Sequence, residues 1–266
     1  MSSAYRIEKD SMGEVKVPKA ALYGAQTQRA VDNFPVSGIC ISRPLIHALG
    51  VIKQGAAKVN AEMDNIPEDV AHAIQLAAQE VIDGKLDEHF PIDIYQTGSG
   101  TSSNMNANEV IAHRAMELVP DLSVKVHPND HINFGQSSND TFPTAIRIAG
   151  YIEAKNVLIP VLKFLRETFL KKGAEYSHVV KTGRTHLMDA MPVTVEQEFG
   201  GYARQIEIGI QRIESALQQM AELPMGGTAV GTGINTDPEF PSKFAAEISK
   251  LTGESFREAE NHFEAQ

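Results

Sequence analysis

The chain has 266 residues, 42% of them hydrophobic, and its net charge is −10 at pH 7. This hydrophobic fraction supports a sizeable core and is too high for a disordered chain, and the absence of a Lys/Arg run argues against a nucleic-acid-binding protein. The single cysteine, Cys40, excludes an intrachain disulfide and a cysteine-based zinc site.

The N-terminal residues give no indication of a secretory signal, since charges begin at Arg6 and no apolar segment follows. No stretch approaches 18 apolar residues, so we expect no membrane span, and the expected compartment is the cytoplasm. Residues 4–17 are predicted to form short extended segments around a turn at residues 10–13.

Three helices are predicted next. In the first, apolar residues recur every three or four positions from Leu45 to Met63. The second begins at Pro67 and ends at Gly84, and the third covers residues 104–119. The pattern therefore predicts a mainly α-helical protein.

Longer helical patterns follow. One begins at residues 140–143 and continues towards Leu170, with Pro160 expected to kink or split it. Another covers residues 194–223, which would span roughly 45 Å at about 1.5 Å per residue. Helices of this length usually pack into long bundles.

These patterns predict two domains. Residues 1–136 are expected to form a mostly helical N-terminal domain, and residues 137–266 the first part of a central long-helix bundle. The last helical segment begins at Asp237, and no clear cap closes the pattern before Gln266. We therefore expect the partner helices to lie outside these residues.

Four loops are rich in glycine and small polar residues: 97–104, 135–140, 182–186 and 226–233. The first two lead directly into helical patterns, and the third precedes one by a few residues. Hydroxyls, amides and free backbone N–H groups near a helix N-terminus can bind an anion. Several such loops that converge could hold a dicarboxylate without a metal, although each one alone is explained more simply by helix capping.

Other motifs are weaker. The glycine loops fit neither the dinucleotide-binding nor the P-loop pattern, and no G-x-S-x-G elbow indicates a hydrolase. Residues 127–131 fit a polar ligand loop or a structural turn better than a metal site, because Pro128 breaks the helical spacing of the two histidines. His186, beside Thr185, is either a structural histidine or an acid–base residue or its partner.

A series of sequence blocks resembles, in order, the fumarase branch (class II fumarate hydratase) of the fumarase/aspartase superfamily over the whole chain. The blocks are residues 12–15, 23–30, 96–101, 103–106, 108–110, 127–130, 136–144, 183–187 and 226–233. Aspartases usually carry Gln at the position of His186 and lack the form of residues 137–143. The resemblance therefore implies a lyase that reversibly hydrates fumarate to L-malate in the tricarboxylic acid cycle.

The resemblance also implies site residues. The substrate-binding residues would be Ser99, Gly100, Thr101, Ser137, Ser138, Asn139 and Thr185. His186 matches the catalytic histidine that assists in activating the water. His127, Asn129 and Asp130 match a secondary dicarboxylate site outside the catalytic pocket.

Two positions depart from the family pattern. The family usually has Lys-Ser where this chain has Phe134 and Gly135, which changes the local charge. The family also commonly has a basic residue shortly before the motif that begins at His127. This chain has Val124 at that position, with Lys125 as a substitute. Both departures bear on the secondary site more than on the catalytic one.

The family fold is a bundle of very long helices from four subunits, so a homotetramer with shared active sites is expected, with no metal or other cofactor. The family's loop G-S-S-x-M-P-x-K-x-N, which supplies the catalytic serine base, is not among these residues, so residues 1–266 alone are expected to be inactive. An aspartase or another fumarate-forming lyase remains an alternative. A non-catalytic helical oligomer is the alternative from another class.

Overall fold

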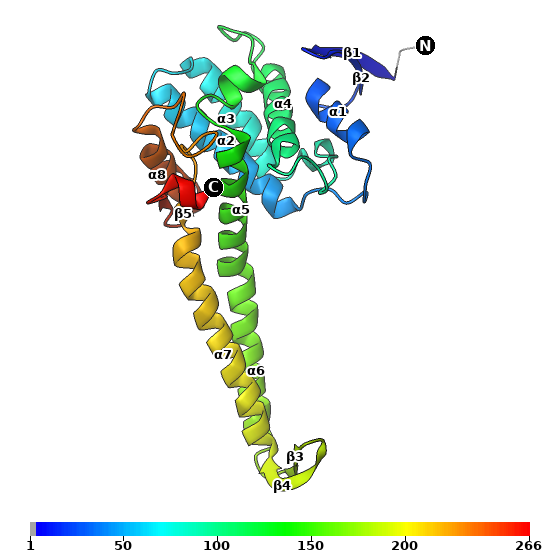
Figure 1. The fold of residues 1–266 in the computed structure, drawn as a ribbon, viewed down its shortest axis with the longest axis vertical. Coiled ribbons are helices and arrows are strands. Elements are labelled where there is room, and N and C mark those ends of the chain that lie inside the picture. The colour runs from blue at the N-terminus through cyan, green and yellow to red at the C-terminus, as the bar shows by residue number, and fades with distance from the viewer. Residues whose placement is uncertain (1–3) are drawn as a thin grey trace. The chain divides into compact units, whose positions relative to one another are not determined.

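Helices dominate the structure, a computed structural model that describes residues 4–266 (Figure 1). The predicted mainly α-helical fold is confirmed. The chain divides into two units, the first comprising Met1–Ala149 and Ala221–Gln266 and the second Gly150–Met220. The predicted domains, divided at residue 136, refer to a larger bundle and stay a prediction.

The first unit opens with an antiparallel hairpin of β1 (Tyr5–Asp10) and β2 (Gly13–Pro18). Gly13 has a φ of +113°, a conformation that glycine adopts at little cost. The extended segments and turn predicted for residues 4–17 are thus confirmed. Helix α1 (Ala25–Asn33) follows, and the Glu109 carboxylate accepts hydrogen bonds from backbone N–H groups at its start.

The core of the first unit forms around helix α2 (Arg43–Glu62), which packs against α3 (Glu68–Ile82). Most of the periodic apolar residues of these two helices are buried as predicted, among them Leu49, Ile52 and Ile74. Helix α2 is buried on most of its circumference, because α4 (Thr101–Leu118) and α8 (Phe240–Thr252) also contact it.

Short elements complete this unit. They are η1 (Asp87–His89), the π-helical turn η2 (Pro128–Ile132), the parallel strands β5 (Glu222–Leu223) and β6 (Arg257–Glu258), and α9 (His262–Ala265). Helix α5 (Ser138–Glu153) begins here, and its last residues belong to the second unit.

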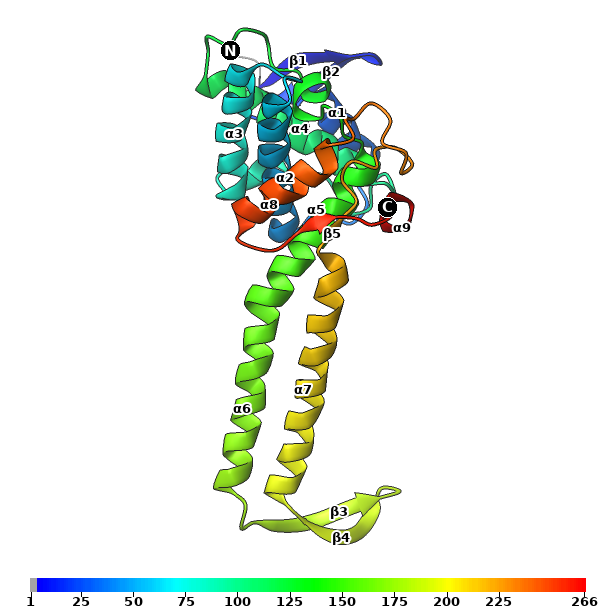
Figure 2. The same cartoon turned by 90° about the vertical axis from the view of Figure 1, so that its left-hand side faces the viewer.

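The second unit is a helical hairpin in which α6 (Ile159–Glu175) and α7 (Val195–Met220) run side by side (Figure 2). Ile159, Ile210 and Leu217 form its small core. The chain segment that connects the two helices forms a β-hairpin of strands β3 (Val180–Thr185) and β4 (Met188–Thr194). The long helix predicted over residues 194–223 is thereby confirmed.

The disruption expected at Pro160 takes the form of a π-helical turn, η3 (Ala154–Leu158), directly before α6. Proline has no N–H to donate, and its ring crowds the carbonyl four residues earlier. The wider turn accommodates both effects, and the backbone stays helical at Leu158 and Ile159. Between residues 4 and 266, the structure contains no helix with the length and apolar character needed to cross a membrane.

Candidate functional site

The first two polar loops meet in the first unit. Gly100 is the N-cap of α4 with a φ of +69°, and a Cβ atom there would overlap the ring of Phe142 on α5. Asn104 Nδ2 on α4 donates to Ser138 Oγ, 3.1 Å away at the start of α5. Both loops lead into helices as predicted, and the structure brings the two together.

Hydroxyl groups are exposed at the first of these loops. Ser99 Oγ lies 2.8 Å from Thr101 Oγ1, and the Ser99 side chain is exposed. Thr101 is the first residue of α4, so the first N–H groups of this helix lie beside the two hydroxyls. Hydroxyls and free N–H groups at a helix start can bind a carboxylate.

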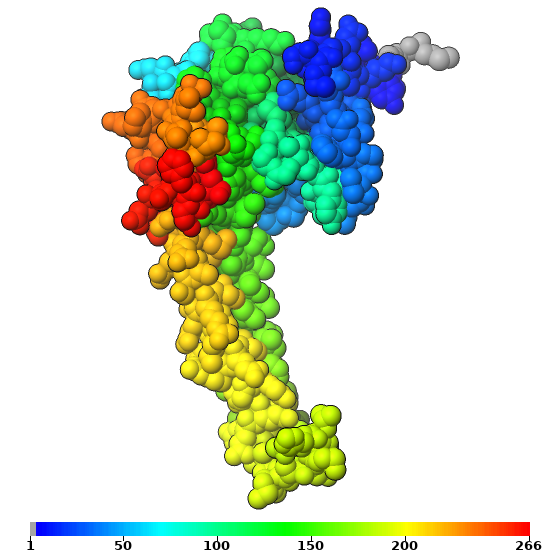
Figure 3. All heavy atoms as spheres, viewed as in Figure 1, coloured from blue at the N-terminus to red at the C-terminus, as the bar shows by residue number. Residues whose placement is uncertain are grey.

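Asp140 joins the second polar loop to the glycine loop at residues 226–233. Its Oδ1 accepts a hydrogen bond from the Ser137 N–H at 2.9 Å, and its Oδ2 accepts from the N–H groups of Gly226 and Thr228 at 3.0 and 2.9 Å. Asn139 Nδ2 adds a bond of 2.8 Å to the Ala229 carbonyl. Figure 3 shows the orange segment of the glycine loop against the green segment around residue 140. Three of the four polar loops therefore converge.

The Asp140 carboxyl is completely buried. Burial raises its pKa to about 6, although the three N–H donors and the Lys53 charge act in the opposite direction. Asp140 therefore has a structural role, because its buried carboxylate links two loops. From the sequence, Asp140 was only one member of a polar cluster.

Lys53 of α2 is a buried charged residue that the sequence pattern did not single out. Its side chain is 0% exposed, and its Nζ donates to Asn133 Oδ1 at 3.0 Å and Gln136 Oε1 at 2.8 Å. Burial lowers the pKa of Lys53 to about 7. The sequence does contain an indication of this burial. A helix that is apolar on almost every side is enclosed by the protein, so a lysine within it cannot reach solvent.

Stability should therefore rise with pH on the alkaline side. The folded-state pKa of Lys53 lies below its unfolded value, so between about pH 7 and 10 the unfolded chain binds more protons than the folded one. We expect the free energy of unfolding to increase by about 2 kcal/mol from pH 7 to pH 9 relative to Lys53→Met, measured by urea denaturation. Lys58→Met, on the exposed side of the same helix, should leave the wild-type pH dependence unchanged. The prediction is contradicted if the difference in the free energy of unfolding between the wild type and Lys53→Met does not change with pH.

An open cavity of about 770 Å³ lies beside the converging loops. It is lined by residues of η2, of the second polar loop and of the glycine loop, including Asn129, Asp130, Ser137 and Thr228. Thr228 is buried and has a φ of +56°, which is unusual for a β-branched residue. Strained backbone of this kind is often found at functional sites.

Residues 127–131 form the turn η2 and the backbone before it. His127 Nδ1 accepts from the Asp130 N–H at 3.3 Å and lies 3.0 Å from the Asp130 carboxylate, and both side chains are exposed. His131 Nδ1 accepts from the His127 N–H, so the two histidines stabilise the turn. No group of three or more His, Cys, Asp or Glu side chains suited to a metal ion occurs in the part of the chain that the structure describes.

The backbone conformation explains why glycine occupies position 135, which is one of the departures from the family pattern. Its φ is +67°, and a Cβ atom would lie 2.6 Å from Thr236 Oγ1. The Thr236 hydroxyl donates to the Gly135 carbonyl at 2.8 Å. Glycine at this position thus permits the close approach of the second polar loop to the segment that follows the glycine loop.

Thr185 and His186 belong to the second unit, whereas the other predicted substrate-binding residues belong to the first. Thr185 ends β3, and His186 and Leu187 form the tip of the β3–β4 hairpin, with φ values of +50° and +60°. The expected proximity of this loop to a helix start is not observed, because strand β4 intervenes before α7. His186 is exposed and makes no hydrogen bond or ion pair with any residue from 4 to 266.

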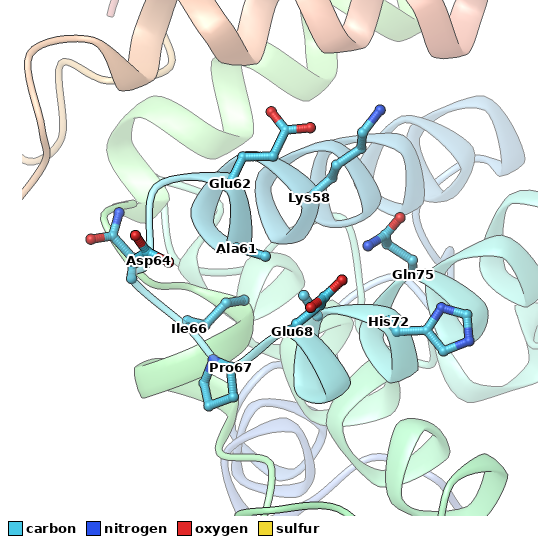
Figure 4. A pocket seen from close by; sticks show the side chains of 11 residues that line it. Lys58, Ala61, Glu62, Asp64, Ile66, Pro67, Glu68, His72 and Gln75 are labelled. Carbon is cyan, nitrogen blue, oxygen red and sulfur yellow. The ribbon is translucent and has the colours of Figure 1, made fainter.

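A separate pocket of about 650 Å³ lies where α2 ends and α3 begins (Figure 4). Its lining includes Glu62, Asp64 and Glu68, with Lys58 as the one lysine. Three carboxylates would repel a dianion, so this pocket is a poor site for a dicarboxylate. None of the site residues predicted from the sequence lines it.

Comparison with known proteins places this chain in a family. The family model described as "Lyase" matches residues 13–266. The class II fumarate hydratase of Halobacterium salinarum is 55% identical over 268 residues, which is 100% of this chain and 57% of the relative. That of Corynebacterium glutamicum is 57% identical over 98% of this chain and 55% of the relative.

Solved structures agree. A class II fumarase from Schistosoma mansoni superposes with a TM-score of 0.94 at 38% identity, covering 98% of this chain and 59% of the other. The chain spans a little more than half the length of the curated relatives it matches. It belongs to the lyase family that includes the class II fumarate hydratases.

Proposed function

We propose that the complete protein catalyses the reversible hydration of fumarate to L-malate. The observation that carries the proposal is the convergence of three polar loops at the starts of α4 and α5, linked through Asp140 and Asn104. The similarity to class II fumarate hydratases supports the same reaction. The tricarboxylic acid cycle is the corresponding pathway, and a cytoplasmic location stays a prediction.

The chemistry explains why such loops are needed. Malate loses a weakly acidic proton from the carbon next to a carboxylate, and the resulting carbanion is stabilised as an aci-carboxylate with two negative charges on one group. Preorganised hydrogen-bond donors aimed at that group are worth about 3–4 kcal/mol each in a water-excluded site. Hydroxyls and helix-start N–H groups can supply this stabilisation, so the proposed mechanism requires neither a metal nor another cofactor.

The proposed roles follow the loops. Ser99, Gly100 and Thr101 contact one substrate carboxylate, and residues 137–139 form the second group of contacts. Thr185 binds substrate, and His186 assists in activating the water as an acid–base residue. The exposed, unpaired state of His186 is consistent with a side chain that finds its partners elsewhere in the assembly.

We further propose a homotetramer in which active sites are shared between subunits. Large apolar side chains of the second unit are exposed, among them Phe164 at 72% and Val161 at 58%. Apolar surface of this kind usually marks a contact with another chain. His127, Asn129 and Asp130, at the exposed turn η2, would form the secondary dicarboxylate site, and two of them line the open cavity.

The proposal is tested by the ultraviolet absorbance of fumarate in plain buffer. We expect the complete protein to reduce the absorbance without ammonium and in the presence of a chelator. Loss of absorbance only with ammonium would identify an aspartase. A folded oligomer that neither changes fumarate nor binds fumarate or malate at equilibrium would be the non-catalytic alternative.

A further inference from the structure

We propose that Lys53 is a positioning residue for Ser138. This inference rests on the proposed function, in which Ser138 binds a substrate carboxylate. Lys53 itself lies out of reach of any ligand, because its side chain is completely buried in the first unit. It acts through a chain of hydrogen bonds that ends at the serine hydroxyl.

The first link fixes the orientation of Asn133. A lysine amino group bound to a side-chain amide donates, so the atom of Asn133 that lies 3.0 Å from Lys53 Nζ must be the oxygen, Oδ1. Asn133 Nδ2 then faces the Gln136 carbonyl at 3.1 Å, where a donor is needed. The side-chain amide of an asparagine can otherwise be placed either way round, and the lysine and the Gln136 carbonyl together remove this freedom.

The second link fixes Asn104. Its amide atom lies 3.1 Å from Asn133 Oδ1, and because that oxygen accepts, the atom must be the nitrogen, Nδ2. The same nitrogen lies 3.1 Å from Ser138 Oγ and donates its second hydrogen there. Asn104 Oδ1 has no hydrogen-bond partner among the described residues, so no other contact competes for the orientation of this amide.

The consequence is the direction of the Ser138 hydroxyl. Because Oγ accepts from Asn104, its own hydrogen is available to a different acceptor, such as a substrate carboxylate. If Asn104 were reversed, its oxygen would take the hydrogen of Ser138, and the serine would present only lone pairs to an anion. Lys53, together with the Gln136 carbonyl, thus sets the direction of the donors from Asn133 to Ser138.

Lys53 also holds the residue before the loop. Its bond of 2.8 Å to Gln136 Oε1 directs Gln136 Nε2 to the Ile132 carbonyl at 3.0 Å. This keeps the backbone before Ser137 in place. Asp140, whose negative charge raises the pKa of Lys53, anchors the same loop from its other side.

The test is a double-mutant cycle in the complete enzyme. Lys53→Met removes the donor with little change in volume, and we expect kcat/KM for fumarate to fall about tenfold or more, mainly through KM, because a charge-assisted bond to the substrate is lost. In a Ser138→Ala background the same change should cost less than twofold, because the effect passes through that hydroxyl. Lys53→Gln, which keeps a donor, should recover part of the loss.

Lys58→Met is the matched control. Lys58 lies on the same helix, at the pocket in Figure 4, where its partly exposed side chain pairs with the buried Glu247 carboxylate, and none of the proposed substrate contacts lines this pocket. We expect less than a twofold change in kcat/KM for this variant. A Lys53→Met enzyme with lowered thermal stability but wild-type KM, or with its full effect in the Ser138→Ala background, would overturn the inference.

A second variant covers the case in which Lys53→Met does not fold. Asn104→Asp is nearly isosteric, and its carboxylate can only accept, so it should take the Ser138 hydrogen and raise KM. If it acts only by repelling the substrate, its effect will persist undiminished in Ser138→Ala, and the inference fails. A wild-type enzyme that leaves fumarate unchanged would overturn the proposed function as well, whereas the outcomes above overturn the role of Lys53 alone.

Discussion

Replacement of His186 by Asn in the complete enzyme should reduce malate turnover by about a hundredfold to ten-thousandfold, the usual range for a lost acid–base residue. The fold should be retained, because the side chain is exposed and its φ of +50° suits asparagine at least as well as histidine. The measurement is kcat for malate, with circular dichroism to confirm the fold.

The matched control for this prediction is His178→Asn. His178 is another exposed histidine of the second unit, in the segment between α6 and β3. We expect its replacement to leave kcat within about twofold, as is usual for a surface position away from the site. Near-normal turnover in His186→Asn would refute the role assigned to His186.

Gly100→Ala should lower the free energy of unfolding by about 2–4 kcal/mol. One part of the cost is the positive φ of +69°, worth about 1–2 kcal/mol for a residue with a side chain. The remainder is steric, because the new methyl group would overlap the Phe142 ring and force helices α4 and α5 apart. Urea denaturation measures the loss, and KM for fumarate should rise with it, since two groups of proposed substrate contacts are displaced.

Gly253→Ala separates the two contributions. Gly253 ends α8 with a φ of +72°, and nothing lies within 4 Å of the position a Cβ would take. Only the backbone cost should appear, about 1 kcal/mol. Equal losses for Gly100→Ala and Gly253→Ala would show that the contact with Phe142 carries no weight, as would a failure of Phe142→Ala to reduce the cost at Gly100.

Much of the fold follows from local sequence signals. Apolar periodicity located α2, α3 and α7, since the residues that face the core recur with the helical repeat. The same reasoning missed Lys53, because periodicity counts lysine as polar and therefore assigns it to the surface. Glu109 escaped for a similar reason, although its carboxylate caps α1 from within α4.

The site was harder to predict than the helices. Composition marked each polar loop, but the bonds that join Asp140 to Gly226 and Thr228 span nearly 90 positions, and no local pattern reports such a contact. The strand context of Thr185 was also missed, because glycine and polar residues are as frequent in hairpins as before helices. The roles of individual residues came from the family resemblance and stay predictions.

The split of the first unit into Met1–Ala149 and Ala221–Gln266 has a consequence for biosynthesis. While the nascent chain emerges, α2 lacks the cover of α8, and Asp140 lacks two of its three N–H donors until residues 226–228 leave the ribosome. The intervening helical hairpin shortens this search, because Gly150 and Met220 at its two ends lie in contact once it has formed. If α6 and α7 pack early, the two segments of the first unit are joined by a short effective loop, and the entropic cost of bringing them together falls.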